Sequence, residues 1–380
     1  MLALKTIAVL GAGHGGQASA ADLTLRGYAV RLFSRSEQAL GPIRERGGIE
    51  LDGAAGAGFA QLELITNDLG EAVTSADLVE LVVPTTAHDF YAAALAPILN
   101  DGQPVFLNPG HTGGGLHFVA ELRRHGFVGQ IRTCEVATLT YGCRRQLPGH
   151  VRIFNVVTAL PFAAFPGRYA DELFELVRQI YPNIVLKRNV LETAFSNINA
   201  VEHPPQTLLN VGWLEHTKGD YEFYYEGTTP GVGRVIDAVD REKMNVARAL
   251  GIDAKSFVER FYETGYTTAH ALEVGTAYQA LHESEPNRHV KGPRTLDHRY
   301  INEDVGQGLV PWAALGDLVG VDTLTMDHLI GLASVVNERN YASEGLTLER
   351  MGLSGVALGD LERFLRDGEL VGRTAVDART

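Results

Sequence analysis

Short runs of β-branched and aliphatic residues alternate with longer amphipathic stretches in the first half of the chain. The apolar runs lie at residues 6–10, 29–33, 62–66, 78–84 and 104–107. Stretches with helical periodicity lie between and after them, at residues 16–26, 36–46, 67–75, 87–99 and 114–125. Strands that alternate with helices in this way predict an α/β fold, in which helices cover both faces of a doubly wound parallel sheet. Further β-like runs at residues 131–137, 151–158 and 185–187 are expected to continue the sheet.

The pattern of apolar positions changes near residue 189. Beyond that point β-branched runs are rare, and apolar residues recur with helical spacing, as at Val232, Ile236 and Val239. We therefore predict two domains, an α/β domain over residues 1–189 and an all-helical domain over residues 190–380. The polar, proline-bearing stretch at residues 283–302 is expected to be a long loop of the helical domain, and loops of that length are often functional.

The composition limits the partners and the compartment that can be expected. The 380 residues carry 33 basic and 46 acidic side chains, which gives a formal net charge of −13. A protein of that charge does not attract nucleic acid or an anionic membrane surface, so neither is expected as a partner. The N-terminal apolar run is too short for a signal sequence or a membrane span, and two cysteines do not make a secreted disulfide framework. We expect a cytoplasmic homodimer without a metal site.

A glycine-rich loop at residues 11–16 follows the first predicted strand and opens the first predicted helix. Its sequence, Gly-Ala-Gly-His-Gly-Gly, matches the GxGxxG pattern in the βαβ context that a dinucleotide-binding fold requires. Gly11 permits a tight turn, Gly13 lets the backbone approach a pyrophosphate, and Gly16 lets the helix pack on the strand. The helix N-terminus adds amide donors and a positive dipole end, and His14 lies beside them. The loop predicts a Rossmann-type NAD(P)-binding domain.

The end of the second predicted strand bears on the choice of cofactor. NAD-binding folds usually place a carboxylate there to bind the ribose 2'-hydroxyl group, but this chain has Ser34 and Arg35. A hydroxyl group and a guanidinium suit a 2'-phosphate, which no carboxylate repels at this point. NADP(H) is therefore expected in preference to NAD(H). The alternative for Arg35 is a solvated surface residue.

Two further strand ends are expected near the cofactor. Pro84 and Thr85 follow the strand at residues 78–84, at the carboxyl edge of the sheet where ligands collect in open α/β folds, and we expect them to border the nicotinamide half. The glycine-rich turn at residues 107–115 is a second strand-to-helix connection. For this turn, direct cofactor contact and a purely structural role stay equally open.

Two segments of the helical domain carry candidate chemistry. Reduction of a C=O or C=N group needs a proton donor, and histidine titrates in the useful range. His203 lies with Asn199 in the polar segment 197–205, which opens the helical domain. Arg299 and Asp304 lie in a second segment, 298–311. A carboxylate there could raise the pKa of a histidine and fix its tautomer, and an arginine could hold a carboxylate substrate. An N-terminal helix histidine, a capping acid and a solvated arginine are the plain structural alternatives.

Over nearly its whole length the chain resembles the octopine and nopaline dehydrogenases, the opine dehydrogenases. The resemblance rests on the glycine loop, the turn at residues 108–115, the segment 197–204, and the segment 299–311 with Leu315 and Gly316 after it. It implies an N-terminal Rossmann domain and a C-terminal helical domain. It also implies an NAD(P)-dependent oxidoreductase acting on CH–NH donors, which condenses an amino acid with a 2-oxo acid and reduces the resulting imine.

The resemblance also implies roles for individual residues. The family's acid–base histidine corresponds to His203, its partner aspartate to Asp304, and its substrate-binding arginine, five positions before the aspartate, to Arg299. Asn199 in the same asparagine-rich segment is a further candidate for substrate binding. The imine is then expected in a cleft between the two domains. NAD-using members of the family have an acidic residue near the end of the second strand, and this chain has Ser34 and Arg35 there instead.

Two other functions fit parts of the pattern. A 2-oxo acid or 2-hydroxy acid reductase with the same two-domain plan would need no amine. A nucleotide-sensing protein that has lost catalysis would keep the glycine loop, but the joint presence of His203, Arg299 and Asp304 argues against it.

Overall fold

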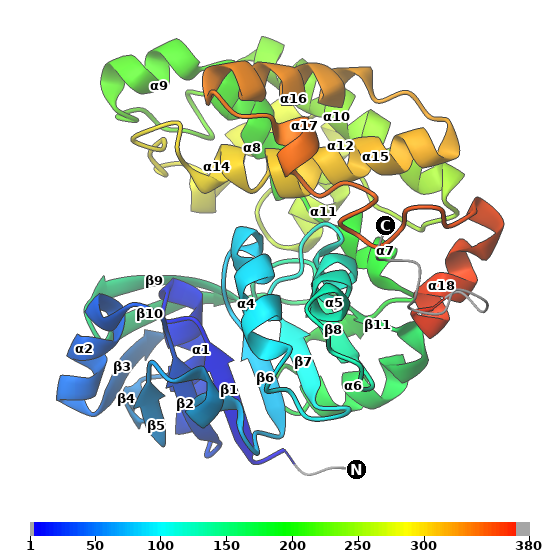
Figure 1. Ribbon diagram of the computed structural model, residues 1–380. Coiled ribbons are helices and arrows are strands. Elements are labelled where there is room, and N and C mark those ends of the chain that lie inside the picture. Colours follow the sequence, from blue (N-terminus) through cyan, green and yellow to red (C-terminus); the bar gives the residue numbers. More distant parts are fainter. Residues whose placement is uncertain (1–3, 370–380) are drawn as a thin grey trace. The chain divides into compact units, whose positions relative to one another are not determined.

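The computed structural model describes residues 4–369, so the first three and the last eleven residues of the predicted domains lie outside it. The chain divides into two compact units (Figure 1). Of the described residues, the first unit contains 4–193 and 355–369, and the second unit is Ala194–Ser354. Among the described residues, no helix combines the length and the apolar character needed to cross a membrane.

The first unit is built on an eight-stranded sheet, in the order β12-β11-β8-β7-β6-β1-β2-β5. All neighbouring strands are parallel except β8 and β11. The strands are β1 (Thr6–Leu10), β2 (Ala29–Phe33), β5 (Leu64–Thr66), β6 (Leu78–Leu81), β7 (Pro104–Leu107), β8 (Arg132–Val136), β11 (Leu160–Phe165) and β12 (Ile184–Leu186). The helices are α1 (His14–Leu25), α2 (Glu37–Arg46), α3 (Leu69–Val73), α4 (His88–Leu95), α5 (Gly114–Arg124) and α6 (Ala170–Val177). The predicted Rossmann-type parallel sheet is confirmed.

A second, four-stranded sheet packs on the other side of α1 (Figure 1). Its order is β4-β3-β10-β9, with β3 (Gly48–Gly53), β4 (Gly58–Gln61), β9 (Tyr141–Leu147) and β10 (His150–Val156). The prediction that residues 151–158 continue the main sheet was therefore wrong. Val151 and Ile153 are buried while Arg152 and Phe154 are exposed, an alternation that fits a sheet with one face in water rather than a fully buried parallel strand.

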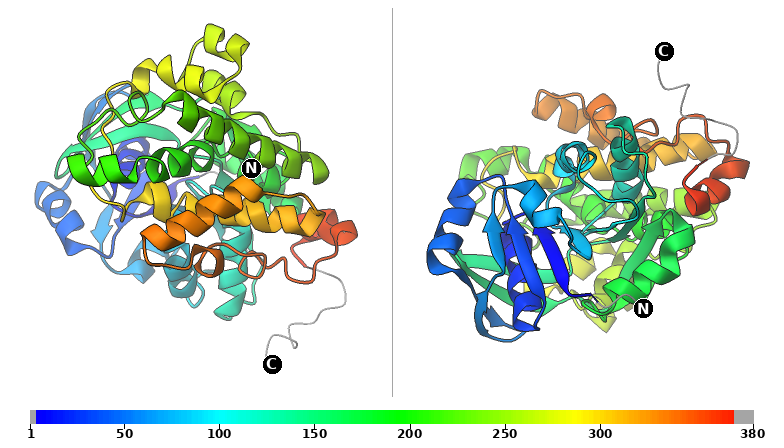
Figure 2. Two further views of the ribbon diagram at one scale, coloured as in Figure 1. Left: turned by 90° about the horizontal axis from the view of Figure 1, so that it is seen from above. Right: turned by 60° about the horizontal axis from the view of Figure 1, so that its bottom comes forward.

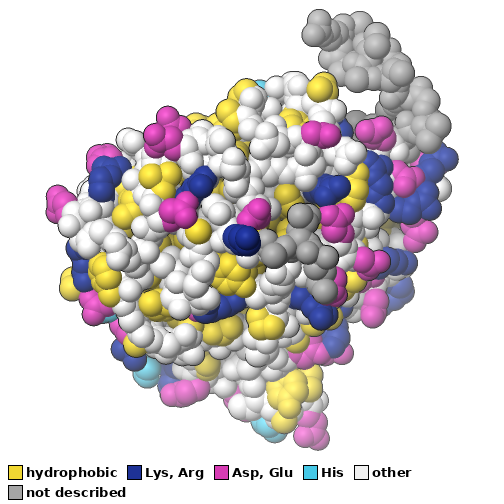
Figure 3. Space-filling model, turned by 90° about the horizontal axis from the view of Figure 1, so that it is seen from below, with side chains coloured by type: hydrophobic (Ala, Val, Ile, Leu, Met, Phe, Trp, Pro, Cys, Tyr) yellow, Lys and Arg dark blue, Asp and Glu magenta, His cyan; other side chains and the backbone are white. Residues whose placement is uncertain are grey.

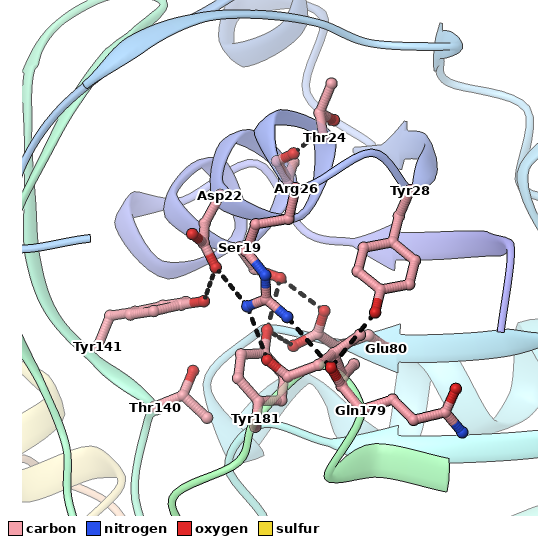
Figure 4. Close-up of polar contacts among 12 residues, drawn as sticks. Ser19, Asp22, Thr24, Arg26, Tyr28, Glu80, Thr140, Tyr141, Gln179 and Tyr181 are labelled. Carbon is pink, nitrogen blue, oxygen red and sulfur yellow. Dashed lines mark hydrogen bonds and ion pairs between the residues drawn. The ribbon is translucent and has the colours of Figure 1, made fainter. Parts of the chain in front are cut away.

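Helix α1 lies between the two sheets and is buried on both sides. This position explains why the helix is rich in glycine, alanine and serine, since small side chains allow sheets to approach it from opposite directions. A buried polar network fixes the helix (Figure 4). Ser19, Asn108 and Tyr181 each donate a hydrogen bond to the Glu80 carboxyl group, at 2.6, 2.7 and 2.7 Å. Burial raises the pKa of Glu80, so the network stabilises a group that the interior would otherwise penalise.

The second unit is built from helices, drawn green to orange in Figures 1 and 2. They are α8 (Asn199–Leu208), α9 (Val211–Thr217), α10 (Pro230–Ala249), α11 (Phe257–Glu263), α12 (Ala269–Val274), α13 (Ala277–His282), α14 (Arg299–Asn302), α15 (Val310–Val319), α16 (Leu324–Val336) and α17 (Tyr341–Glu344). Within the described part of this unit, β structure is limited to an isolated bridge between Glu222 and Lys291, so the predicted helical character is confirmed. A π-helical turn, η4 (Val305–Leu309), precedes α15.

The C-terminal segment belongs to the first unit rather than to the helical one. Helix α18 (Leu361–Asp367) places Phe364 on Phe165 of β11, with ring centroids 5.5 Å apart. The Arg168 guanidinium donates a hydrogen bond to the carbonyl oxygen of Asp367 at 2.5 Å. The predicted domains, 1–189 and 190–380, divide the chain a few residues earlier and assign this segment to the helical domain. The helical periodicity of the C-terminal segment alone does not show which unit this segment packs against.

Candidate active site

The glycine loop has the geometry of a phosphate-binding turn. Gly11 has a φ of +117°, which glycine adopts without strain. A Cβ at Gly16 would lie 1.7 Å from the Gly11 carbonyl oxygen, so only glycine permits α1 to start this close to β1. A Cβ at Gly13 would meet nothing within 4 Å, which leaves the backbone open to a ligand. Gly13 is also the N-cap of α1 and supplies no side chain to the free amides, which suits a pyrophosphate.

A cavity of about 370 Å³ lies beside this loop in the first unit. It is lined by the residues that follow β1, β2 and β6, by the end of a 3-10 turn and by Tyr91 of α4. The lining residues are Gly11, Ala12, Gly13, Ser34, Arg35, Ser36, Val82, Val83, Pro84, Ala87 and Tyr91. Five of the predicted cofactor residues, Gly11, Gly13, Ser34, Arg35 and Pro84, therefore line one pocket. The cavity matches what a dinucleotide fold places at the carboxyl edge of its sheet.

The other predicted cofactor residues lie close by but do not line the cavity. Gly16 is buried in the packing of α1 on β1. His14 accepts a hydrogen bond at Nδ1 from the Arg145 amide, at 2.8 Å, and so ties the loop to β9. Burial and the neighbouring arginines lower the pKa of His14. Thr85 is buried at the start of a short 3-10 turn, Thr85–Ala87.

The Arg35 side chain is held by aromatic rings. Its guanidinium carbon lies 4.1 Å from the ring centroid of Phe90 and 6.0 Å from that of Tyr91. Cation–π contacts of this kind hold the guanidinium plane in place while its N–H donors stay available. None of the described residues that line the cavity is acidic.

The turn at residues 108–115 is built around a buried carboxyl group. Glu135 accepts a hydrogen bond from the Gly115 amide at 2.7 Å and another from the Thr193 hydroxyl group. A Cβ at Gly110 would lie 2.3 Å from Oε2 of Glu135, so a glycine is required there. Burial raises the pKa of Glu135 to about 7. The turn's glycines therefore have a structural role, whatever the turn contacts.

In the second unit, the structure brings His203 and Asp304 together although they lie 101 positions apart in the sequence. Nδ1 of His203 lies 2.7 Å from Oδ2 of Asp304, and both side chains are almost fully buried. A carboxylate can only accept, so Nδ1 carries the hydrogen and Nε2 is left as the acceptor in the neutral ring. The Tyr224 hydroxyl group lies 2.8 Å from Nε2 and donates to it. The Tyr300 ring stacks on the imidazole at a centroid distance of 3.8 Å.

Small residues make this juxtaposition possible. Asp304 immediately precedes η4, and η4 packs against α8, which carries His203. A Cβ at Gly308 would lie 2.4 Å from the Cβ of Ala200, so the two segments approach as closely as they do because residue 308 is a glycine. π-Helical turns are rare in proteins, and those that occur often lie at functional sites. Two opposing effects act on the pKa of His203: burial lowers it and Asp304 raises it, with a net lowering.

The two predicted substrate-binding residues, Arg299 and Asn199, are each the first residue of a helix in the second unit. Arg299 opens α14, its side chain is half exposed, and its Nε lies 3.7 Å from a carboxylate oxygen of Glu303. Asn199 opens α8 one turn before His203, so the two share a face of that helix. The backbone amide of Asn199 donates to the Asn197 side chain at 3.0 Å. The structure thus places Asn199 next to the histidine along α8.

Three residues around His203 were missed from the sequence: Glu202, Tyr224 and Tyr300. Glu202 and Tyr300 lie inside the segments already chosen, and the chain neighbours of His203 and Arg299 could have been considered with them. Tyr224 lies in an aromatic stretch at residues 221–225, which has no motif to link it to His203. Only the fold brings it to Nε2.

One group in the first unit has the spacing of metal ligands. Asp89, His117 and Glu121 place one ligand atom each within 4.8 Å of one another. Glu121 also pairs with Arg124, and Asp89 is exposed. His117 and Glu121 are buried, and His117 also pairs with Asp89, so ion pairs within the protein account for the contacts of this group.

A Rossmann-type unit with an open dinucleotide pocket, joined to a helical unit with a buried His–Asp pair, defines an NAD(P)-dependent oxidoreductase. Comparison with known proteins then gives the family. The profile described as "NAD/NADP octopine/nopaline dehydrogenase, alpha-helical domain" matches residues 186–337. An opine dehydrogenase of Arthrobacter sp. (strain 1C) is 38% identical over 356 residues, covering 94% of this chain and 97% of that protein. The chain belongs to the opine dehydrogenase family.

More distant relatives agree with this membership. Octopine dehydrogenase of Pecten maximus is 23% identical over 78% of this chain and 79% of its own length. Among solved structures, octopine dehydrogenase with NADH and L-arginine has a TM-score of 0.77 at 18% identity, over 98% of this chain and 100% of that chain. Yersinopine dehydrogenase with NADP+ has a TM-score of 0.71 at 16% identity, over 96% and 98% of the two chains. At these identities the structural matches show the fold.

Family membership confirms the predicted reaction class. The protein is an oxidoreductase that acts on CH–NH donors and reductively condenses an amino acid with a 2-oxo acid through an imine. It uses a nicotinamide cofactor. The alternative of a simple 2-oxo acid or 2-hydroxy acid reductase is not favoured by these relatives.

Proposed function

We propose that His203 is the acid–base group of this reaction, that Asp304 orients it, and that Arg299 binds the carboxylate of the 2-oxo acid. The observation that carries the proposal is the buried His203–Asp304 pair, in which the carboxylate fixes the hydrogen on Nδ1 and so directs Nε2 to the substrate. Asn199, one helical turn before His203, is proposed to bind substrate beside it.

The proposed mechanism assigns each chemical task to a named group. When bound, the nicotinamide cofactor supplies the hydride that reduces the imine carbon. His203 in its protonated form donates a proton at the substrate nitrogen, and Asp304 stabilises the imidazolium. In the reverse direction neutral His203 accepts that proton. Because the Tyr224 hydroxyl group occupies Nε2 in this structure, substrate must displace it or receive the proton through it.

NADP(H) is proposed as the preferred cofactor. Ser34 and Arg35 line the pocket at the end of β2, where a 2'-phosphate would be bound, and no acidic residue lines the described cavity. The stacking of Arg35 on Phe90 holds the guanidinium in place for a bidentate contact.

Replacing Arg35 by aspartate tests the cofactor preference. The Arg35→Asp variant loses a cation and gains a charge that repels the 2'-phosphate, so the Kd for NADPH is expected to rise by about 10- to 100-fold. The Kd for NADH is expected to change less, because a ribose hydroxyl group can donate to the new carboxylate. Fluorescence titration with both cofactors measures the ratio. Equal losses for NADH and NADPH would refute a role in 2'-phosphate recognition.

Replacing Arg299 by alanine tests the carboxylate site. The apparent KM for the 2-oxo acid is expected to rise by about tenfold or more, because a charge-assisted hydrogen bond to the substrate is lost. The Kd for NADPH is expected to stay the same, since Arg299 lies in the other unit. Steady-state kinetics with each substrate varied in turn give both values. An unchanged KM for the 2-oxo acid would contradict the assignment.

A substrate matrix tests the proposed function as a whole. Purified protein is assayed with NADPH against a panel of amino acids crossed with 2-oxo acids, and oxidation is followed by absorbance. We expect oxidation that requires both substrates, and one positive pair identifies both. Oxidation by a 2-oxo acid alone would support the reductase instead. A cytoplasmic location and a homodimeric state remain part of this proposal, and light scattering of the purified protein tests the latter.

A further inference from the structure

Glu202 is a buried carboxyl group beside the proposed acid–base histidine. It precedes His203 on α8, its side chain is 4% exposed, and its Oε1 lies 3.7 Å from Nε2 of His203. Its second oxygen, Oε2, is buried and has no hydrogen-bond partner among the described residues. A buried polar atom without a partner destabilises the folded state, so a plain structural role does not account for it.

Among the described residues, no lysine or arginine is found at ion-pair distance from Glu202. Within residues 4–369, the basic group found at ion-pair distance from Glu202 is His203 itself. The nearby Asp304 disfavours a second negative charge on Glu202. Tyr224 and Tyr300 also lie close enough to interact with Glu202 electrostatically, and Arg299 acts on the same two tyrosines. Burial, with a further contribution from Asp304, raises the pKa of Glu202 well above its usual range.

Imine formation needs more proton transfers than His203 alone supplies. The amino group must lose a proton before its nitrogen can attack the carbonyl carbon, and the hydroxyl group of the resulting adduct must gain a proton to leave as water. In the proposed mechanism His203 donates its proton to the substrate nitrogen in the reduction step. Nε2 of His203 has both the Tyr224 hydroxyl group and Oε1 of Glu202 as neighbours. A substrate atom that replaces the Tyr224 hydroxyl at Nε2 would therefore lie near Nε2 together with Oε1 of Glu202.

We propose that Glu202 is the acid–base group of the condensation half-reaction, while His203 serves the reduction. The inference rests on the proposed function of this site. It adds a second proton-transfer residue that acts before the hydride step.

The proton count closes within the site. The Glu202 carboxylate takes one proton from the substrate ammonium group, and the free amine forms a C–N bond to the carbonyl carbon. One proton moves from that nitrogen to the former carbonyl oxygen, which gives a neutral carbinolamine. The Glu202 carboxyl group then protonates the hydroxyl group, the C–O bond breaks, and the nitrogen lone pair forms the iminium ion. Water leaves and Glu202 returns to its carboxylate, with no change in oxidation state.

The test compares condensation with hydride transfer in the Glu202→Gln variant. Wild-type enzyme first produces the opine from the best pair in the substrate matrix. Reductive kcat/KM with that amine and 2-oxo acid requires condensation, and we expect the variant to lose at least about tenfold. Single-turnover oxidation of the opine, with NADP+ present and enzyme in excess, ends at the imine and needs no condensation. This rate is expected to stay within about twofold of the wild-type rate.

Matched variants separate this role from general damage to the site. Glu202→Met keeps the length of the side chain and removes the carboxyl group. If the effect of Glu202→Gln comes from loss of the carboxyl group rather than from altered packing, Glu202→Met must show the same difference between the two rates. Glu121→Gln, a buried carboxylate in the first unit, is expected to leave both rates unchanged. Equal losses in both measurements, or no loss in either, would overturn the proposal. A wild-type protein with no amine-dependent oxidation would refute the proposed function instead.

Discussion

Replacing His203 by alanine is expected to lower kcat for reductive condensation by about 10²- to 10⁴-fold, the usual contribution of a positioned acid–base group. The loss should appear in kcat more than in KM, because the proposed role of the imidazole is proton transfer at the reacting nitrogen rather than ground-state binding. Steady-state kinetics with saturating NADPH measure it. Turnover close to that of the wild type would reject the assignment.

The control for this variant is cofactor binding. The dinucleotide pocket lies in the first unit and His203 in the second, so the Kd for NADPH should change by less than about twofold. The variant also removes a buried ring that stacks on Tyr300, and a moderate decrease in Tm is expected from the lost packing. Circular dichroism at the assay temperature confirms that the protein remains folded. A protein that is unfolded there would call for His203→Gln in its place.

The Asp304→Asn variant is expected to lose about 10²-fold or more in kcat. An amide can donate to Nδ1 as well as accept from it, so it no longer fixes the hydrogen on Nδ1, and it has no charge to stabilise the imidazolium. Asp304 raises the pKa of His203 against the lowering effect of burial, so its removal lowers that pKa further. In the proposed mechanism the reductive direction uses protonated His203, so the reductive rate is lost as the pH rises through the pKa of His203. In the variant this loss should occur at a lower pH than in the wild type.

The pH profile of kcat/KM distinguishes this electrostatic effect from a general loss of structure. An Asp327→Asn variant, on α16 of the same unit, changes a carboxylate outside the site and should leave the profile in place. If kcat is lowered in Asp304→Asn but the pH profile does not shift, a group other than His203 determines the pH dependence.

Much of the first unit follows from local pattern. The strands β1, β2 and β7 begin and end at the predicted residues because short buried runs between glycine-containing turns leave little choice of boundary. The four-stranded sheet was missed because its strands face water on one side and pair across long sequence separations, as β3 with β10. The assignment of α18 to the first unit was missed for the same reason, since packing partners are not local.

The proposed site could be predicted where its residues lie in short polar segments that match a known family. His203, Arg299 and Asp304 were chosen from sequence segments and from a resemblance, and the fold brings His203 and Asp304 into contact. Tyr224 could not be chosen in this way, because its role arises from a contact between α8 and a loop 21 residues later in the chain. The partnerless oxygen of Glu202 is likewise a property of three-dimensional packing.

The return of the chain to the first unit has a consequence for biosynthesis. The N-terminal unit is made first, but Phe165 and Arg168 acquire their partners on α18 only after the whole helical unit has been translated. At the usual rates of chain elongation, a nascent nucleotide-binding unit would wait roughly ten seconds or more with that apolar surface uncovered. A ribosome-bound chain stopped before residue 355 should therefore recruit chaperones that recognise exposed apolar segments.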